Sequence, residues 1–198
     1  NKDMRISDFN KISFIDNIPL YSVPTTAGSG AELTSFATVW DYTSNEKHSF
    51  KSQFLLPKIA LYDYKLLKSL NYSVSVSSGF DTISHAFESI WNKFADPLSI
   101  NLSTQSLSLS MKSIRGYVIT EKKDPNLKNM QLASILSALA IARTKTGIAH
   151  SISYPLTSIY KIPHGIASSF VLPEVLLFNS KKDDGRLKKL ISDLLYSS

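Results

Sequence analysis

The sequence predicts two unlike parts, a strand-and-loop segment over residues 1–77 and a helical domain over residues 78–198. Short runs of β-branched and aromatic residues, separated by turn-forming residues, fill the first part. After Ser78 the apolar residues recur at intervals of three and four, which is the spacing of one helix face. The chain has 198 residues and is 43% hydrophobic, so it can bury one sizeable core or two small ones.

The strands of the first part are expected where β-forming residues gather between turns. Four such runs cover Leu20 to Val23, Phe36 to Trp40, Phe50 to Leu56 and Ile59 to Tyr62. Gly, Asn, Ser and Pro separate these runs, so we expect short strands joined by loops.

The helices of the second part are expected to begin at capping residues. Ser78 can accept a hydrogen bond from the amide near Asp81. Asp96 stands before Pro97, and a proline suits the first helical position. The inward face of the helix after Pro97 is expected to carry Ile100, Leu107, Met111, Ile114 and Val118.

Two later helices show apolar stripes of the same spacing. A helix over Asn126 to Arg143 is expected to turn inward Leu132, Ile135, Leu136 and Leu139. A helix from Arg186 onward carries its stripe at Leu187, Leu190, Ile191, Leu194 and Leu195. This last stripe needs a partner, either helices beyond residue 198 or another subunit, so we expect the chain to be a piece of a longer protein.

Composition narrows the functional classes. The chain has no Cys, which excludes disulfides, thiolate metal clusters and a cysteine nucleophile. Its net charge of +6 permits anionic ligands, but Lys and Arg are scattered, so we expect no nucleic-acid binding. The apolar stretches are shorter than the roughly 20 residues that a bilayer requires, so we expect no membrane segment. Residues 1–10 are polar and charged, so we expect no secretion signal and a cytoplasmic protein.

One carboxylate and three histidines are the candidate metal ligands. Asp81 and His85 are four residues apart, so on a helix they share a face and can hold one ion. The alternatives are a capping acid that answers Ser78 and a hydrogen-bonded, half-buried imidazole. Glu88, one turn after His85, is expected to make a surface or interhelical contact, with support of the metal ligands as the alternative.

His150 and His164 are 14 residues apart, with Pro155 and Pro163 between them. The prolines argue against one continuous helix, so the two imidazoles can meet only through a returning loop. Three imidazoles and one carboxylate would form a shell of three nitrogens and one oxygen, which suits Zn²⁺ or Fe²⁺ better than Ca²⁺ or Mg²⁺. A surface imidazole or a helix cap is the alternative for each histidine.

A loop that contains two glycines, Pro-Thr-Thr-Ala-Gly-Ser-Gly-Ala-Glu at residues 24–32, follows the first β-type run. Glycines let a backbone approach a ligand, and the hydroxyl and amide groups can donate to phosphate or ribose oxygens. The alternative is a tight turn. The loop matches neither a phosphate-binding Walker loop nor a complete Gly-x-Gly-x-x-Gly motif.

Taken in order, four motifs resemble the iron-containing alcohol dehydrogenase family. They are the loop at residues 24–32, Gly-Phe-Asp-Thr-Ile-Ser-His-Ala-Phe-Glu at 79–88, Gly-Ile-Ala-His at 147–150 and Pro-His-Gly at 163–165. The resemblance implies a single divalent ion, Fe²⁺ or Zn²⁺, held by Asp81, His85, His150 and His164. It also implies a dehydroquinate synthase-like architecture. Residues 1–77 would be an α/β remnant of a dinucleotide-binding domain, and residues 78–198 a truncated all-α metal-binding domain.

The same resemblance implies a nicotinamide cofactor, NAD or NADP. Together with the small residues of the loop, it places the cofactor contacts at Thr25, Thr26, Gly28, Ser29, Thr34 and Lys47. An ordinary solvated lysine is the alternative for Lys47.

The chain departs from the family in three respects. The Gly-Gly-Gly-Ser turn that grips the pyrophosphate in the family does not occur in this sequence. The family also continues with further helices, so we expect the chain to be a fragment. Many members carry a second histidine where this chain has Tyr154, whose phenol can still donate a proton.

These features predict a metal-dependent alcohol dehydrogenase or aldehyde reductase. We expect no catalytic residues beyond the metal site. The segments at residues 36–41, 88–91 and 150–157 look most like a branch that includes phosphonoacetaldehyde reductases, which implies a small anionic aldehyde. We expect small-molecule partners, and a homodimer is compatible with the apolar stripe near the C-terminus. The alternatives are a sugar-phosphate cyclase of related fold and a non-catalytic metal-binding fragment.

Overall fold

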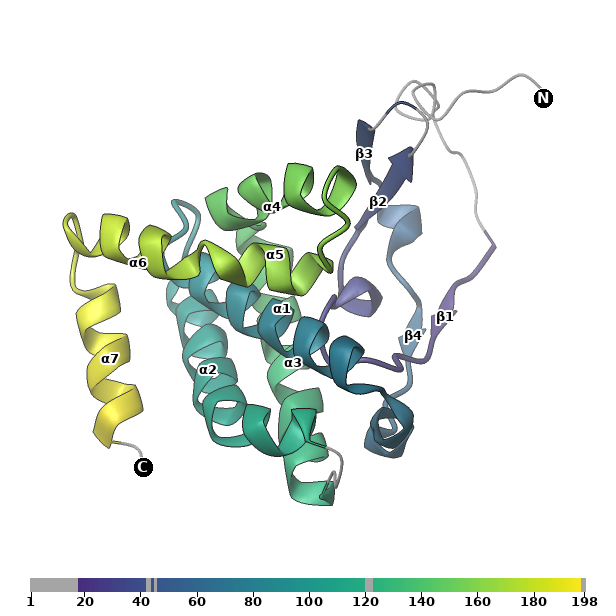
Figure 1. Ribbon diagram of the computed structural model, residues 1–198, viewed down its shortest axis with the longest axis horizontal. Helices are drawn as coiled ribbons and strands as arrows, with labels where there is room; N and C mark the ends of the chain where they lie inside the picture. The colour runs from purple at the N-terminus through teal and green to yellow at the C-terminus, as the bar shows by residue number, and fades with distance from the viewer. Residues whose placement is uncertain (1–17, 42–43, 45, 120–122, 197–198) are drawn as a thin grey trace.

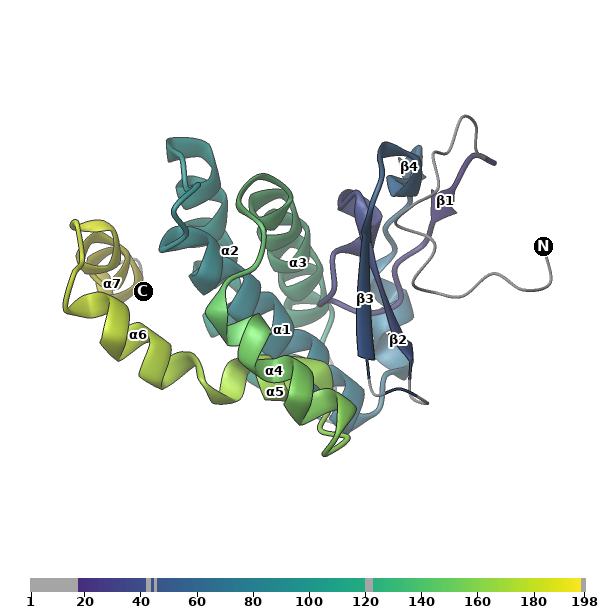
Figure 2. The same cartoon turned by 90° about the horizontal axis from the view of Figure 1, so that it is seen from above.

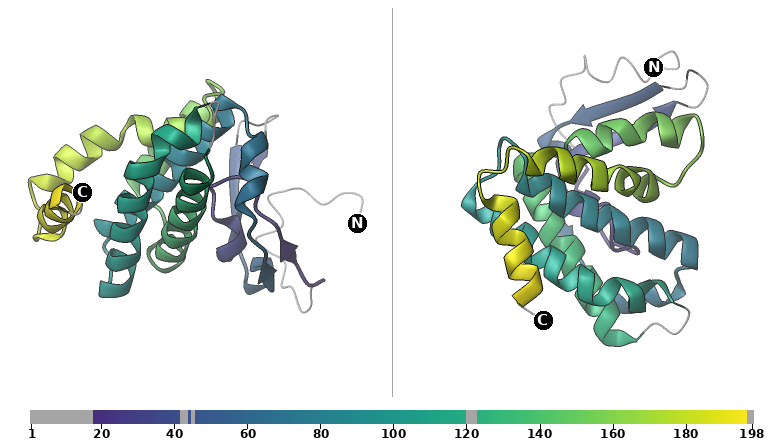
Figure 3. Two further views of the ribbon diagram at one scale, coloured as in Figure 1. Left: turned by 90° about the horizontal axis from the view of Figure 1, so that it is seen from below. Right: turned by 60° about the vertical axis from the view of Figure 1, so that its left-hand side comes forward.

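The computed structural model describes residues 18–41, 44, 46–119 and 123–196. Within these ranges the chain forms a group of helices with the strands beside it (Figure 1). Figures 2 and 3 show the strands at one end of this group and the last helices at the other. Residues 1–10, on which the expectation about secretion depends, lie outside the described residues.

Two small sheets hold the strands. β1 (Tyr21–Ser22) pairs in parallel with β4 (Ile59–Ala60), and β2 (Phe36–Asp41) pairs antiparallel with β3 (Glu46–Lys51). Three of the four predicted runs contain a strand. The third prediction is wrong for most of its length, because β3 ends at its second residue and Gln53–Leu55 form a 3-10 turn. The described residues of the β2–β3 hairpin are exposed or partly buried, so β3 is built mostly from polar residues, with Phe50 its one apolar residue, and shows no apolar run.

The long helix α1 (Tyr72–Ile90) carries two of the candidate ligands. It begins before Ser78, because Asn71 is its N-cap and accepts a hydrogen bond from the Val74 amide at 2.9 Å. The prediction that Ser78 caps this helix is wrong, since its hydroxyl donates to the Val74 carbonyl within the helix at 2.8 Å. Helix α1 therefore crosses residues 77 and 78, and the division into domains at this point stays a prediction.

Helices α2 (Pro97–Val118) and α3 (Asp124–Thr144) pack against α1 and against each other. The predicted start of α2 is confirmed. The Asp96 carboxylate accepts a hydrogen bond from the Ser99 amide at 2.7 Å, and the Ser99 hydroxyl accepts one from the Asp96 amide at 2.9 Å. This reciprocal pair satisfies two amides at the helix end.

Small residues form the contact between α2 and α3. Helix α2 buries a row of serines, Ser99, Ser103, Ser106, Ser110 and Ser113. Half of the buried residues of α3 are Ala or Ser, and the Ser106 hydroxyl donates to the Ala133 carbonyl at 2.7 Å. The predicted inward positions Leu132, Leu139 and Met111 are wrong, because they are 46%, 38% and 47% exposed. Small side chains let the two backbones approach closely, which turns the leucines outward.

Four shorter helices follow, α4 (Ile148–Ser158), α5 (His164–Phe170), α6 (Leu172–Ser180) and α7 (Arg186–Tyr196). Helix α7 returns to α2, where Leu187 and Leu190 join a core cluster that includes Leu107. The chain itself thus covers part of the C-terminal apolar stripe, while Ile191 and Leu195 stay exposed.

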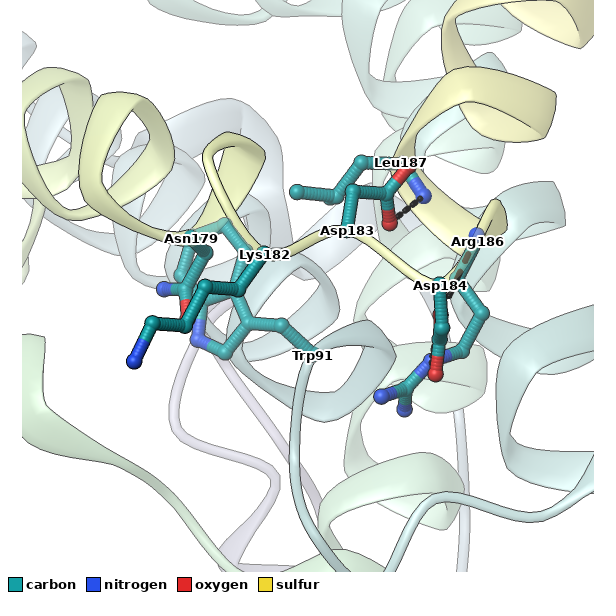
Figure 4. Close-up of a pocket in the computed structure, with 7 residues that line it drawn as sticks. All are labelled: Trp91, Asn179, Lys182, Asp183, Asp184, Arg186 and Leu187. Atoms are coloured by element: carbon teal, nitrogen blue, oxygen red, sulfur yellow. Dashed lines mark hydrogen bonds and ion pairs between the residues drawn. The ribbon is translucent and has the colours of Figure 1, made fainter.

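A small polar pocket lies at the turn between α6 and α7 (Figure 4). Arg186 lines this pocket, and its Nη1 donates to the carbonyl oxygens of Ile90 at 2.8 Å and Asn92 at 3.1 Å. Asp183 accepts a hydrogen bond from the Leu187 amide at 3.0 Å. The charged groups of the pocket therefore join α7 to the end of α1 and cap α7.

Among the described helices, none is by itself both long and apolar enough to cross a bilayer. Only α3 and α4 taken together reach the required length and hydropathy, and they are bent by 107° where they meet.

We predict that Asn71→Ala lowers the free energy of unfolding by about 1 kcal/mol, because it removes an acceptor for the free amides at the start of α1. Asn71→Asp keeps a capping oxygen and should stay close to wild type. Urea unfolding followed by circular dichroism measures both variants. Equal unfolding midpoints for Asn71→Ala and wild type would contradict the assignment of the cap.

Candidate metal centre

Helices α4 and α5 lie against α1 (Figures 1 and 2). Four side chains from these three helices meet there. Asp81 and His85 are one turn apart on α1, His150 lies in the first turn of α4, and His164 begins α5. The Asp81 Oδ1 lies 3.4 Å from His150 Nε2, 3.8 Å from His85 Nε2 and 4.0 Å from His164 Nε2. The three imidazoles therefore surround one carboxylate oxygen.

These distances suit the donor atoms of one cation. Two ligand atoms about 2.1 Å from a tetrahedral ion lie about 3.4 Å from each other. Buried polar atoms normally have hydrogen-bond partners, yet the Asp81 Oδ1 and His150 Nε2 are buried and have none among the described residues. A divalent cation between them would satisfy both atoms, and the set of nitrogen and oxygen donors fits Fe²⁺ or Zn²⁺.

His85 stands slightly apart from the other three side chains. Asp81, His150 and His164 each offer one ligand atom, and these three atoms all lie within 4.8 Å of one another. The His85 ring stacks on the His150 ring with centroids 4.7 Å apart, and its Nδ1 is buried without a hydrogen-bond partner in the described structure. The structure thus groups three of the four predicted ligands most closely and places His85 beside them.

The predicted returning loop, between α4 and α5, brings His164 to this place. The reasoning from Pro155 is wrong, because this residue lies inside α4, and only Pro163 stands in the loop, at the start of α5. Lys161 in this loop has a φ of 57°. Gly165 then packs onto α1, where its amide donates to the Ser77 hydroxyl at 3.2 Å. A Cβ atom at Gly165 would lie 1.8 Å from the Ser77 carbonyl oxygen. Any larger residue would therefore push α5, and with it His164, away from Asp81.

Burial and mutual charge set the protonation of the four groups. Burial acts to raise the pKa of Asp81, but the three imidazoles outweigh it and hold that pKa below its usual value. Burial lowers the pKa of His85 to about 4 and also lowers the pKa of His164. Burial disfavours charge on His150 too, but Asp81 and Glu88 outweigh it and raise its pKa to about 9. Near neutral pH, Asp81 is thus ionised and two imidazoles present unprotonated nitrogens, the form that binds metals.

Glu88 has a larger role than the sequence indicates. Its side chain is fully buried, its Oε1 accepts a hydrogen bond from the Ala149 amide at 2.7 Å, and its Oε2 lies 2.5 Å from His150 Nδ1. Burial acts to raise the pKa of Glu88, but the hydrogen bonds to His150 and to α4 amides lower it further than burial raises it. The contact is therefore interhelical, and it holds the Nδ1 of His150, the ring nitrogen opposite the one near Asp81. The sequence signal for this role is the spacing of Glu88, which follows Asp81 by seven residues and shares its helix face.

The loop at residues 24–32 packs against the helices. Gly28 is buried, and a Cβ atom there would lie 2.8 Å from the Ser78 Cβ on α1. Gly30 has a left-handed φ of 63°, and its Cβ would lie 2.3 Å from the Ala138 Cβ on α3. The glycines are therefore required for close packing and a tight turn, whatever else the loop contacts.

The predicted cofactor contacts differ in exposure. Thr25 and Ser29 are exposed and can reach a ligand from outside, while Thr26 is partly buried and Thr34 is buried. The cofactor roles of these residues, and of Gly28 and Lys47, stay predictions.

Lys47 is not an ordinary solvated lysine. Its Nζ lies 3.1 Å from the ring centroid of Tyr154 on α4 and 5.9 Å from the ring of Trp40, its cross-strand neighbour. The two rings meet edge to face with centroids 6.1 Å apart. Burial lowers the pKa of Lys47 to about 8. Burial, together with the charges of His150 and Lys47, lowers the pKa of His164. Tyr154 is one turn after His150 on α4, so the Lys47 ammonium group lies over the helix that carries this candidate ligand.

Comparison with known proteins shows similarity to iron-containing alcohol dehydrogenases. A family model described as Fe-containing alcohol dehydrogenase family, C-terminal, matches residues 75–197, and one described as iron-containing alcohol dehydrogenase matches residues 2–64. A probable alcohol dehydrogenase of Escherichia coli is 28% identical over 180 residues, which are 90% of this chain and 46% of that protein. The NAD-dependent methanol dehydrogenase of Bacillus methanolicus is 28% identical over 88% of this chain and 46% of its own length. The chain thus spans about half the length of the curated relatives it matches.

Two solved structures show the same fold. The sulfoacetaldehyde reductase of Bifidobacterium kashiwanohense, in complex with NAD⁺, has a TM-score of 0.85 and 28% identity, covering 89% of this chain and 47% of that one. An iron-containing alcohol dehydrogenase of Thermotoga maritima has a TM-score of 0.86 and 27% identity, covering 98% of this chain and 53% of that one. The predicted fold class, an α/β remnant followed by an all-α domain, is confirmed.

We predict that Asp81→Asn abolishes tight binding of divalent metal, because it removes the charged member of the donor set. Zn²⁺ at about 100 times its dissociation constant should stabilise wild type by about 2.7 kcal/mol and leave the variant unchanged. His164→Ala should weaken binding as well. Thermal unfolding with and without Zn²⁺ and elemental analysis measure the effect, with Asp184→Asn in the α6–α7 turn as the control. Wild-type metal content in Asp81→Asn would place the site elsewhere.

We predict that Lys47 loses its proton near pH 8 rather than near 10.5, because burial disfavours the charged amine. The Lys47 charge is then present below pH 8 and is lost as the pH rises through that value. Tyr154→Ala uncovers the Nζ and should move the titration back toward 10.5. The Cε chemical shift of labelled lysine reports the midpoint, and a wild-type midpoint that Tyr154→Ala leaves unchanged would contradict the prediction.

Proposed function

The chain belongs to the iron-containing alcohol dehydrogenase family, and we propose that it is the metal-binding part of an alcohol dehydrogenase or aldehyde reductase. The enzyme would exchange a hydride between NAD(P)(H) and a small aldehyde or alcohol. The observation that carries this proposal is the convergence of three imidazoles on the Asp81 Oδ1, a buried atom that lacks a hydrogen-bond partner in the described structure.

When bound, the cation supplies Lewis-acid chemistry at a carbonyl or alcohol oxygen, and the nicotinamide supplies or accepts the hydride. Asp81, His150 and His164, with His85 beside them, would hold Fe²⁺ or Zn²⁺. Burial of Asp81 and His150 keeps bulk water away from the inner side of the cluster. Fe²⁺ agrees with the name of the family, and both ions suit this donor set.

The proposed substrate is a small aldehyde that carries an acidic group. Lys47 supports this assignment, because its ammonium group is held over Tyr154, one turn after His150 on α4, and would attract an anion. A sulfoacetaldehyde reductase is among the similar structures, and its named substrate carries a sulfonate. A phosphonate or carboxylate would meet the same charge.

The cofactor would lie along the loop at residues 24–32, with exposed Thr25 and Ser29 as its first contacts. The relatives reported above are alcohol dehydrogenases and a reductase, which supports redox chemistry over the sugar-phosphate cyclase alternative. The proposal includes a cytoplasmic location, and the homodimer stays a prediction.

We predict that the longest natural polypeptide containing this chain, loaded with Fe²⁺ or Zn²⁺, oxidises NADH or NADPH with short aldehydes. Asp81→Asn should lower kcat/KM by at least about 1,000-fold, because the Lewis acid contributes several kcal/mol to the transition state. The loss of reduced-nicotinamide absorbance measures the rate. A metal-loaded protein that oxidises neither coenzyme with any aldehyde would favour the non-catalytic alternative.

Lys47→Ala separates the two roles considered for this lysine. If Lys47 binds the acidic group of the substrate, the variant raises KM for sulfoacetaldehyde and leaves KM for propionaldehyde unchanged. If Lys47 contacts the cofactor instead, KM for the coenzyme rises with both aldehydes.

A further inference from the structure

Helix α4, which carries His150, has no cap of its own. Its N-cap is Gly147, which has no side chain to accept a hydrogen bond from the first amides. The amides of Ala149 and His150 instead donate to Glu88 Oε1 on α1, at 2.7 and 3.3 Å. A residue of one helix therefore caps the start of another, which fixes the relative position of the two helices.

The second oxygen of the same carboxylate holds the His150 ring. Glu88 Oε2 lies 2.5 Å from His150 Nδ1, while the His150 Nε2 lies on the Asp81 side. An ionised carboxylate only accepts hydrogen bonds, so the Nδ1 carries a proton in both the neutral and the charged form of the ring, and a cation can bind only at Nε2 after that atom releases its own proton. The other ring nitrogen is then the one that faces Asp81. Glu88 is fully buried, so the ring has little freedom to turn.

Gly147 makes this approach sterically allowed. A Cβ atom at Gly147 would lie 3.0 Å from Glu88 Oε1 and 3.4 Å from Glu88 Cδ, which is tighter than ordinary contact. An alanine at this position would force the carboxylate to shift by a few tenths of an ångström. Glycine here is therefore matched to the carboxylate on α1.

We propose that Glu88, with Gly147, is the positioning element of the metal site: it fixes His150 so that Nε2 is the nitrogen presented to the cation beside Asp81. This inference rests on the proposed metal-binding function. Glu88 and Asp81 lie on one rigid helix, seven residues apart, so the carboxylate that orients His150 is held at a constant distance from the carboxylate that shares the ion.

Glu88→Gln separates this role from that of a helix cap. The glutamine carbonyl can still accept a hydrogen bond from the Ala149 amide, but its NH₂ group cannot accept one from His150 Nδ1. If Glu88 only caps α4, the variant keeps the metal affinity of wild type. If Glu88 positions the ring, the affinity falls although the helix cap is kept.

The test is a titration of the full chain with Co²⁺, followed by the visible absorption of the bound ion. We expect Glu88→Gln to bind about 10- to 100-fold more weakly than wild type, the range found for groups that orient metal ligands. Gly147→Ala should weaken binding several-fold, and the double variant should be no weaker than Glu88→Gln alone, because Gly147 acts through Glu88. Glu174→Gln, an exposed glutamate on α6, is the matched control and should bind as wild type does.

A second readout follows the ring itself. In the Zn²⁺-loaded wild type labelled with ¹⁵N-histidine, the His150 Nδ1 proton should give a slowly exchanging downfield signal that disappears in Glu88→Gln. Wild-type Co²⁺ affinity together with this signal in Glu88→Gln would overturn the inference.

Other outcomes are equally decisive. A wild-type chain that binds neither Co²⁺ nor Zn²⁺ would remove the proposed metal site and not only the role of Glu88. If Glu88→Gln does not fold, Gly147→Ala decides. Weaker Co²⁺ binding with wild-type unfolding of the metal-free chain supports the inference, and unchanged binding overturns it.

Discussion

The burial of one carboxylate, Asp81, is the constraint on which the rest of the structure depends. Taking an ionised carboxylate out of water costs several kcal/mol unless opposite charge or hydrogen-bond donors replace the lost hydration. Three imidazoles from three helices approach its Oδ1 to within 4.0 Å, so the helices must be placed to high accuracy. The packing around α1 therefore serves the site as much as it serves the core.

Glycines and small residues provide that accuracy. Gly28 and Gly165 approach α1 at Ser78 and Ser77 more closely than a Cβ atom would allow, and a Cβ atom at Gly147 would displace the Glu88 carboxylate by a few tenths of an ångström. Each of these contacts sets the position of a different segment, the loop at residues 24–32, α4 and α5. Helix α1 is thus the common reference against which two of the three histidine-bearing segments are placed.

The sequence could predict the features that depend on local spacing. The Asp81–His85 pair, the Asp96 cap of α2 and the returning loop before His164 all follow from residues close together in the chain. Features that depend on packing between distant segments could not be predicted. Leu132 and Leu139 have the spacing of an inward face, but small residues beside them allow closer helix contact and occupy the interface.

The same distinction applies to the site. The histidines can be recognised as candidate ligands because the motifs that contain them resemble a known family. The buried contact of Glu88, by contrast, exists only because the fold brings the start of α4 to α1. The role of Tyr154 likewise depends on a distant segment, since Trp40 and Lys47 reach it from the β2–β3 hairpin. The spacing on α1 places Glu88 on the same helix face as Asp81, but a single sequence does not show which distant segment meets that face.

The four candidate ligands differ in their exposure to solvent. Asp81, His85 and His150 are buried, and Glu88 closes the side behind His150, whereas the His164 side chain is 37% exposed. Strand β3 contacts α4, the helix that carries His150, and Lys47 on this strand lies over Tyr154. His164 is therefore the member of the cluster that solvent reaches most readily, while the other ligands are enclosed by the packing of α4 and α5 on α1.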